Sequence, residues 1–444
     1  MERKLKDSGI PWIGEIPEHW ESGRFKSRFS TRKGLSITKA DLTESGIPVI
    51  SYGQIHSKHN NGTTVTEDII KYVPQTYLQS DSNALVDKGD FIFADTSEDI
   101  SGCGNCAYID CDGEIFGGYH TIIASGGGNN KYFSYLFLTD AWRSQIRCNV
   151  TGIKVFSISQ AILANTRLIV PSIAEQKAIA AYLDKKCSEI DELIEVEQQM
   201  ISDLEAYRQA LISEVVTKGL NPDTRMVESD CDWFASHPLH WRTEKIRNLF
   251  LKRTEKNNPI KTKERLSLSI DKGITLYADK TTNLDRFKDD FTQYQLAHPN
   301  DIVLNSMNMI VGAVGKSAYY GCVSPVYYVI YSKDAKVNMD FYGYLLNTPI
   351  IRDVYHKLGQ GIYAIERGDG RVNTCRLKVD YYEFSQIKVP VPPVEEQNAI
   401  VSFLKEKEYE IDELIKVKQE KIETLKQYRQ SLIFEAVTGK YIIS

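Results

Sequence analysis

One stretch of this chain occurs twice, as residues 171–219 and again as residues 392–439. The two copies align at an offset of 221 residues, so that Glu175-Gln176 corresponds to Glu396-Gln397. A repeat of this length constrains the fold more than any other feature, because it means that the chain is built from two similar halves.

Each copy has the pattern of a long helix. Ser172 and Glu175 form the pattern of a capping box, and Gly219 and Gly439 are typical helix stops. Between these signals, apolar residues recur with a period of 3.5, which is typical of a coiled coil. At ~1.5 Å per residue each helix is roughly 65 Å long, more than one globular domain needs for its own core.

Each helix carries one charged residue near the middle of its apolar seam, Glu197 in the first copy and Lys418 in the second. Two antiparallel helices in full overlap would bring these residues close together. A polar pair inside a seam costs stability but fixes the register. We therefore predict that the helices pack against each other, antiparallel, within the chain. The alternative is that each helix lies on its own globular domain and its charge is solvated.

The repeat extends into the globular segments. Trp12 corresponds to Trp233, and His19-Trp20 corresponds to His240-Trp241. The predicted organisation is a globular domain over residues 1–170, a helix over 171–220, a second globular domain over 221–391 and a helix over 392–444. Short apolar strands and helical stretches follow one another in both domains, which predicts the α+β class.

Two internal matches extend the alignment inside the domains. Asp90 corresponds to Asp301, and each begins a short apolar strand. Further along, residues 103–108 match residues 314–319, so that Gly104 corresponds to Gly315. The two halves thus share the same order of strands, turns and helices, which we call the frame, while their surface residues differ.

Composition limits the class of protein. The hydrophobic content of 42% suits a folded globular chain, and no apolar run approaches the ~20 residues that span a bilayer. The eight cysteines are scattered, and no apolar leader follows Met1, so we expect a cytoplasmic protein. The net charge is −5, but residues 221–391 carry 24 basic and 20 acidic residues. DNA binding by charge alone therefore looks weak, whereas binding assisted by partner subunits fits.

Two motifs suggest chemistry and are better explained by structure. Residues 311–317 end like a phosphate-binding loop, but Ile310 stands where that loop needs glycine. Cys103 and Cys106 have zinc-ligand spacing without a second ligand pair, so buried cysteines are the preferred interpretation. No catalytic set and no metal site is predicted.

Polar and basic loops of the two domains are the candidates for binding. Arginine and lysine neutralise phosphates or contact guanine, and asparagine contacts adenine. For any single residue, an ordinary solvated surface is the simpler explanation. The candidate DNA-binding residues are Lys33, Lys58, Asn60, Arg143, Arg147, Lys154, Arg253, Lys256, Lys261, Lys263, Arg367 and Arg371.

The duplicated junction and the tryptophan-anchored start of the chain resemble the DNA specificity subunit of type I restriction–modification enzymes. The resemblance rests on residues 12–20 and on the repeated stretches 170–183 and 391–404. It covers essentially the whole chain. Two departures are modest: the second lead-in, residues 233–241, is degraded, and the net charge is acidic.

The resemblance implies a non-catalytic DNA-recognition subunit. Two target-recognition domains would each read one half of a split DNA sequence, and an antiparallel helix pair would set the gap and bind the other subunits. Two methyltransferase subunits would bring S-adenosylmethionine, and motor-nuclease subunits would bring ATP and magnesium. Pseudo-two-fold symmetry of a tandem repeat suits such bipartite recognition.

Two other classes of function remain open. One is an enzyme that uses the Gly315-Lys316-Ser317 turn or the Cys103 and Cys106 pair, which nucleotide titration and metal analysis would detect. The other is a helical scaffold that spaces protein partners without contacting DNA, which footprinting of an assembled complex would distinguish.

Overall fold

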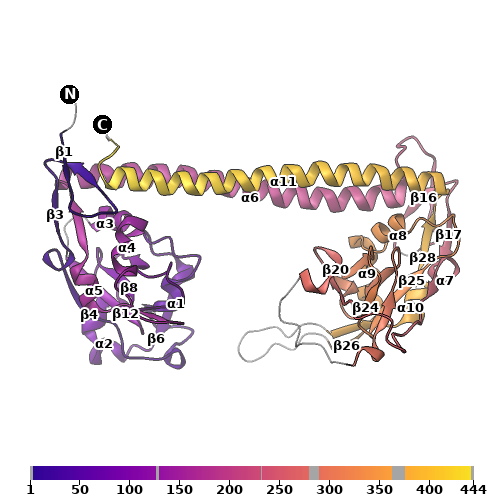
Figure 1. Cartoon of the computed structure of the whole chain (residues 1–444), viewed down its shortest axis with the longest axis horizontal. Coiled ribbons are helices and arrows are strands. Elements are labelled where there is room, and N and C mark those ends of the chain that lie inside the picture. The colour runs from indigo at the N-terminus through magenta and orange to yellow at the C-terminus, as the bar shows by residue number, and fades with distance from the viewer. Residues whose placement is uncertain (1–3, 127–129, 232, 280–289, 363–375, 442–444) are drawn as a thin grey trace. The chain divides into compact units, whose positions relative to one another are not determined.

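The computed structural model describes residues 4–126, 130–231, 233–279, 290–362 and 376–441 (Figure 1). The chain forms two compact units. The first combines Met1–Gln198 with Gln419–Ser444, and the second is Gln199–Lys418. Each unit therefore contains a globular domain and parts of both long helices. No helix in the described ranges has a stretch both long and apolar enough to cross a bilayer.

The globular part of the first unit is built on a four-stranded antiparallel sheet in the order β10-β8-β12-β4. All side chains of the interior strand β8 are buried, because both faces of the sheet are covered. One face packs through aromatic rings on two helices, and the other packs on a second sheet in the order β6-β5-β11-β7. The strands are β4 (Phe29–Lys33), β5 (Ile47–Ile50), β6 (Lys71–Val73), β7 (Leu85–Val86), β8 (Phe91–Ala94), β10 (Cys106–Tyr108), β11 (Ile115–Gly117) and β12 (Thr121–Gly126), and the helices are α3 (Asn130–Leu138) and α4 (Asp140–Arg147).

The second unit repeats the main sheet and the two helices that follow it, whereas two-stranded sheets stand in place of the second four-stranded sheet in its described residues. Its main sheet has the order β18-β25-β22-β23, which matches β4, β12, β8 and β10 strand by strand. Two helices again follow the sheet. In both units a threonine between the two helices caps the start of the second one, Thr139 in the first unit and Thr348 in the second. The elements are β18 (Leu251–Lys252), β22 (Ile302–Asn305), β23 (Val314–Lys316), β25 (Tyr327–Tyr331), α8 (Met339–Leu345) and α9 (Pro349–Leu358). The predicted α+β repeat is confirmed.

The structure corrects the register between the two halves. Gly104 and Gly312 both adopt left-handed φ values, 97° and 98°. A Cβ at either glycine would approach an arginine of the following helix, Arg143 in one half and Arg352 in the other. Residues 103–108 therefore correspond to residues 311–316, three positions before the predicted match.

This correction also places the residues of the phosphate-loop pattern. Lys316 lies in strand β23, where its Nζ is 2.5 Å from Asp340 Oδ1. Strand backbone cannot wrap a phosphate as a glycine-rich loop does. In the first half, Cys103 and Cys106 are both fully buried, as predicted. No group of three or more His, Cys, Asp or Glu side chains within the described ranges is arranged to hold a metal ion.

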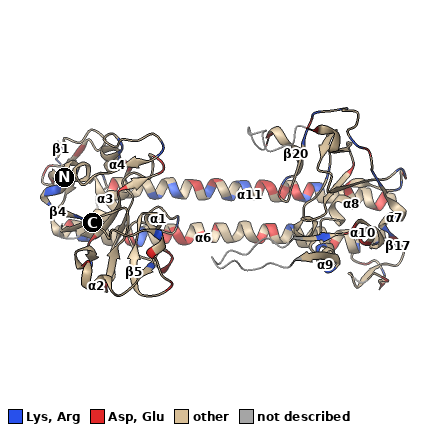
Figure 2. Cartoon of the chain, turned by 90° about the horizontal axis from the view of Figure 1, so that it is seen from below, with Lys and Arg blue, Asp and Glu red and all other residues tan. Residues whose placement is uncertain are grey.

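The two repeated stretches form long helices, α6 (Ile173–Lys218) and α11 (Val394–Val437). The predicted capping box is present, because Glu175 N donates to Ser172 Oγ at 3.3 Å and Ser172 N donates to Glu175 Oε2 at 3.2 Å. The helices end before Gly219 and Gly439, whose φ values of 80° and 72° suit glycine. Acidic residues predominate along α6, whereas basic and acidic residues are mixed along α11 (Figure 2).

Within each unit the two helices pack antiparallel, as predicted. In the first unit, Arg429 pairs with Asp191 at 3.4 Å and Lys421 pairs with Glu197 at 2.6 Å. The residue numbers decrease along α11 as they increase along α6, so the two helices are antiparallel. In the second unit, Arg208 forms an ion pair with Asp412. The apolar seam is buried at both places, by Leu183, Cys187, Ile190, Leu432 and Ala436 in the first unit and by Ile212, Val215, Ile400 and Leu404 in the second.

The charged seam residues fall on either side of the boundary between the units. Glu197 is buried in the first unit, where its carboxylate meets Lys421. Lys418 belongs to the second unit, where its Nζ is 3.0 Å from Met200 Sδ. The predicted pairing of Glu197 with Lys418 stays a prediction.

Candidate nucleic-acid interface

Four segments of the first unit meet around a polar cleft of about 680 Å³. They are helix α1 (Tyr52–Ile55), the segment after strand β9 (Thr96–Ser97), the turn before β10, and helix α4. The cleft combines arginine, amide and aromatic groups, which are the groups that contact phosphates and base edges in protein–DNA complexes. Its polar lining consists of Tyr52, His56, Ser97, Glu98, Asp99, Ser101, Asn105, Asp140, Arg143 and Arg147.

Two arginines on one face of α4 line the cleft. Arg143 Nε donates to the carbonyl of Phe137 at 2.8 Å, and burial lowers the pKa of its guanidinium, which nonetheless remains charged. Arg147 Nη1 is 3.0 Å from Asp140 Oδ1. Its Nε is buried and has no hydrogen-bond partner in the part of the chain that the structure describes. Buried polar atoms without partners are rare, and a ligand or an ordered water is one explanation for such an atom.

A histidine and an amide are held in a fixed orientation in the cleft. His56 Nε2 lies 2.9 Å from the carbonyl of Thr96, which accepts only, so Nε2 carries the proton. His56 Nδ1 can then accept from Asn105 Nδ2 at 3.2 Å. These two contacts fix the orientation of the Asn105 amide, and its Oδ1 can accept a hydrogen bond from a ligand. An oriented asparagine amide is suited to the donor–acceptor pair of adenine.

Aromatic rings stand beside this part of the cleft. The ring of Tyr52 is 5.6 Å from Tyr119 and 5.5 Å from His120, both in edge-on geometry. His120 has a φ of 54°, which is uncommon for a residue other than glycine. Its Nδ1 is 3.3 Å from Asp95 Oδ1, and the backbone of Asp95 donates to the His120 carbonyl at 3.1 Å. Backbone strain of this kind is concentrated at functional sites.

The predicted residues of the first unit have different roles. Arg143 and Arg147 meet in the cleft, and Lys58 is exposed two residues after His56. Lys154 is exposed on the loop before β13 (Phe156–Ser157), and Lys33 is exposed at the end of β4. Asn60 instead fixes the backbone, because its Nδ2 donates to the carbonyls of Ile55 and Cys106 at 2.8 and 3.0 Å. We therefore leave Asn60 out of the proposed interface.

Arg253 of the second unit binds a buried carboxylate within its own domain. It forms two hydrogen bonds with Asp301, from Nε at 2.6 Å and from Nη2 at 2.8 Å, and Asp301 is buried. Arg32 and Asp90 form the equivalent pair in the first unit, at 3.2 Å. In both halves the pair links two strands of the main sheet that have one strand between them. Because Nε and Nη2 of Arg253 both bind Asp301, this side of the guanidinium is not available to a base or a phosphate.

Of the other predicted residues of the second unit, three are exposed and two lie outside the described residues. Lys261 is exposed and pairs with Glu255, which also receives His298 Nε2 at 2.8 Å. Lys256 and Lys263 are exposed in the same segment. Arg367 and Arg371 lie outside the described residues.

Sequence reasoning did not select several residues that define the cleft. Tyr52 and Asn105 line the cleft, and His120 stands beside Tyr52; the three come from separate segments that only the folded sheet brings together. Asn105 was visible within the Cys103–Cys106 segment, but the cysteines suggested metal chemistry instead. The useful signal was an asparagine between two buried cysteines, because a polar residue there must point away from the core.

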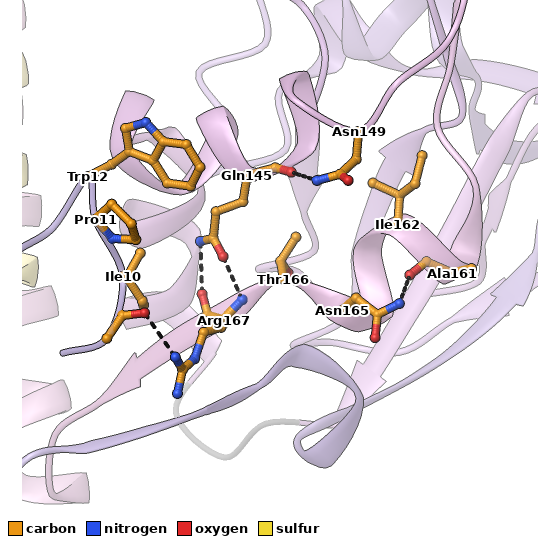
Figure 3. A pocket seen from close by; sticks show the side chains of 11 residues that line it. Ile10, Pro11, Trp12, Gln145, Asn149, Ala161, Ile162, Asn165, Thr166 and Arg167 are labelled. Atoms are coloured by element: carbon orange, nitrogen blue, oxygen red, sulfur yellow. Dashed lines mark hydrogen bonds between the residues drawn. The ribbon is translucent and has the colours of Figure 1, made fainter.

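A second pocket, of about 400 Å³, lies between the lead-in loop and helices α4 and α5 (Gln160–Asn165) of the first unit (Figure 3). Trp12 is 45% exposed at its edge. The polar groups are used internally: Gln145 Oε1 accepts from Arg167 N at 2.8 Å, and Arg167 Nη1 donates to the carbonyl of Gly9 at 2.8 Å.

The second unit repeats this pocket at about the same volume, around Trp233, α9 and α10 (Tyr381–Gln386). Lys388 stands where Arg167 stands in the first unit, and its Nζ is 2.7 Å from Asp230 Oδ2. Hydrogen bonds from Lys388 and Thr243 lower the pKa of Asp230 to about 2. The tryptophan pocket thus belongs to the frame that both halves share, unlike the polar cleft.

Comparison with known proteins is consistent with this arrangement. Residues 17–206 match the family model described as the type I restriction modification DNA specificity domain. A putative type I restriction enzyme MjaX specificity subunit from Methanocaldococcus jannaschii is 23% identical over 440 residues, covering 96% of this chain and 95% of that protein. The EcoKI specificity subunit of Escherichia coli K12 is 23% identical over 226 residues, 48% of this chain and 46% of that protein.

Two solved structures share the fold. One, from a study of assembly and conformational transition of the type I R-M system, has a TM-score of 0.63 at 16% identity and covers 96% of this chain and 99% of its own. The crystal structure of the HsdS subunit from Thermoanaerobacter tengcongensis has a TM-score of 0.51 at 16% identity, covering 96% and 98%.

Proposed function

We propose that this chain is a DNA specificity subunit of a type I restriction–modification system, because residues 17–206 match the model of that domain and a relative named as such a subunit is similar over almost the whole chain. Residues 1–170 and residues 221–391 are two target-recognition domains, and each contacts one half of a split sequence. The first domain reads through the cleft that contains Asn105 and Arg147. The subunit is non-catalytic, and the reactions on DNA belong to its partners.

The observation that carries this proposal is that the two halves share a frame but differ at the cleft. Frame positions are the same, because Gly104 matches Gly312 and Arg143 matches Arg352. At the cleft, Ala313 replaces Asn105 and His356 replaces Arg147 in the corrected register. Two domains with one architecture and different polar groups are suited to two different half-sites.

The long helices are proposed as the spacer between the half-sites. Residues 171–220 and residues 392–444 contain uninterrupted helices of 46 and 44 residues that pack antiparallel in each unit. A helix keeps its length under load because every interior peptide group is hydrogen-bonded along the axis. The unread gap in the DNA would then be set by the helix pair and not by loops.

Partner subunits are proposed to complete the activity. The repeated frame, including the pockets at Trp12 and Trp233, gives the chain two like surfaces, which suits two copies of one partner. We propose two methyltransferase subunits that carry S-adenosylmethionine, and motor-nuclease subunits that carry ATP and magnesium. A cytoplasmic location follows from these partners and remains part of the proposal.

Methylation profiling tests the proposal directly. The chain is assembled with its methyltransferase subunits, incubated with random-sequence DNA and S-adenosylmethionine, and the modified sites are sequenced. We expect two short defined blocks separated by a gap of fixed length and free sequence. Modification without sequence preference, or within one continuous block, would contradict bipartite reading and would favour a scaffold that only spaces proteins.

A further inference from the structure

A short hairpin in the first unit carries the most exposed large apolar side chain in the described part of the chain. The hairpin, residues 151–157, connects α4 to α5. Ile153 at its tip is 95% exposed, whereas the next most exposed, Tyr409, is 68%. Val155 on the same tip is 50% exposed, and Lys154 between them is also exposed.

The hairpin is held in place at its base. Ser157 N donates to the carbonyl of Thr151 at 3.2 Å, and β13 pairs antiparallel with β9. One residue further, Ile158 is buried, and its N–H donates to the carbonyl of Asp95 at 2.7 Å. Gly152 closes the turn with a φ of 145°, and a Cβ there would lie 1.9 Å from the Val155 carbonyl oxygen. Ile153 is thus presented to solvent by a closed turn.

The hairpin stands beside the polar cleft. Strand β9 joins the two features, because Ser97 lines the cleft while it pairs with Phe156 of the hairpin. His56 contacts the same strand from the other side, through the Thr96 carbonyl. A duplex that contacts Arg147 and Asn105 in the cleft would therefore meet the hairpin tip as well.

We propose that this hairpin enters the major groove of the first half-site and that Ile153 contacts the 5-methyl group of a thymine. The inference rests on the proposed function. A loop closed at its base in this way suits the major groove, ~12 Å wide, better than the minor groove, ~6 Å wide. Within the major groove, the thymine methyl is the apolar group on the base edges. Lys154 is placed to neutralise a phosphate at the groove wall.

The chemistry accounts for the otherwise unfavourable exposure of Ile153. Apolar surface in water is costly, and a single contact with a methyl group removes part of it from water on both partners. Ile153 is then a specificity-determining residue, because cytosine and guanine offer no such methyl. The first half-site must therefore contain at least one A·T pair.

Replacing thymine by uracil tests the contact, because uracil lacks only the methyl group. Each thymine of the first half-site, on either strand, is replaced singly in duplexes, and binding by the complex with its methyltransferase subunits is measured. One replacement should weaken binding about fourfold, the effect of one buried methyl group. In the Ile153→Ala complex, the same replacement should have no further effect, and binding to the thymine duplex should already be weaker.

Two control variants separate the contact from general damage. Ile153→Val keeps a β-branched apolar side chain and should keep the sensitivity to uracil. Leu251→Ala removes another exposed aliphatic side chain, 46% exposed in β18 of the second unit, and should bind like the parent. Equal sensitivity to uracil in the parent and in Ile153→Ala would overturn the inference.

The outcomes also distinguish this inference from the proposed function. A complex without sequence preference would refute both. A bipartite site whose first half lacks an A·T pair, or that tolerates uracil at every thymine, would refute only the thymine contact. Kinking of the duplex with an unchanged response to uracil would likewise refute it, in favour of insertion between base pairs.

Discussion

Trp20 Nε1 donates to Glu175 Oε1 at 3.0 Å, although the two residues are 155 positions apart in the sequence. Glu175 is also the third residue of the capping box that begins α6, so one carboxylate both starts the helix and holds the globular domain against it. Trp241 and Glu396 repeat the contact at 2.9 Å in the second unit. The contact between the globular domain and its long helix is therefore repeated in both units, as the helix is.

Acid should weaken the first of these joints. Burial alone would raise the pKa of Glu175, but hydrogen bonds from Trp20, His19 and Ser172 outweigh it and lower the pKa to about 2. The unfolded chain has a carboxyl pKa of about 4.3. Because the folded-state pKa is the lower one, Glu175 contributes stability above about pH 4.3 that is lost as the pH falls toward 2.

The corresponding variant is Glu175→Gln, which should be less stable than the parent by about 1–2 kcal/mol at pH 7. This difference should shrink between about pH 5 and pH 2, because the parent loses its own contribution there. Urea unfolding followed by tryptophan fluorescence across this range measures it. Glu195→Gln, an exposed carboxylate on the same helix, is the control and should leave stability unchanged. A difference that is constant with pH would show that the charge of Glu175 is not what matters.

Loss of Arg253 should damage folding before it damages recognition. Arg253→Ala would leave the buried carboxylate of Asp301 without its main partner, which costs about 3 kcal/mol for such pairs. Arg32→Ala should act in the same direction through Asp90. Thermal unfolding measures both. Lys263→Ala changes an exposed cation in the neighbouring loop and should leave the melting temperature within about 1 °C.

Substitutions in the polar cleft should alter only the first half-site. Asn105→Ala removes one fixed amide, and the loss of a good base contact changes discrimination by about 1–3 kcal/mol at one position. Methylation profiling should show relaxed preference at one position of the first block and an unchanged second block. Lys88→Ala, at a surface ion pair with Asp112, is the control. A change in the second block alone would reverse the assignment of domains to half-sites.

Longer helices should lengthen the unread gap. Inserting seven residues after Gln198 and seven after Lys418 adds one seam repeat to each helix and keeps the apolar stripe in phase. The helices lengthen by ~10 Å, about three base pairs of DNA. Profiling should show both half-sites unchanged and the gap increased by about three. An altered block with an unaltered gap would contradict a helical spacer.

Local signals made the long helices predictable. A capping box, a seam of period 3.5 and a terminal glycine each act within a few residues, and all are present at α6. The repeat then identified the second copy. The halves could not be aligned as well inside the domains, because Gly315 and Gly312 are three residues apart and only Gly312 has the left-handed backbone that Gly104 also has.

The binding residues were harder to identify because their roles depend on distant partners. Arg253 looks like a DNA contact until the fold brings Asp301, 48 residues later, against its guanidinium. Asn60 looks like a base reader until two backbone carbonyls take its amide protons. Arg143 and Arg147 were selected as part of one basic stretch, and helix α4 places both in the cleft, whereas Tyr52 and His120 meet only through the sheet.

The first unit also has a consequence for the order of synthesis. Its core includes Val437, whose carbonyl accepts from the Tyr132 hydroxyl at 2.9 Å, 305 residues away. The second unit, by contrast, is one unbroken stretch of sequence. During synthesis, the first unit therefore cannot complete its core until the C-terminal helix has emerged from the ribosome. The second unit can fold as soon as its own continuous stretch of sequence has emerged.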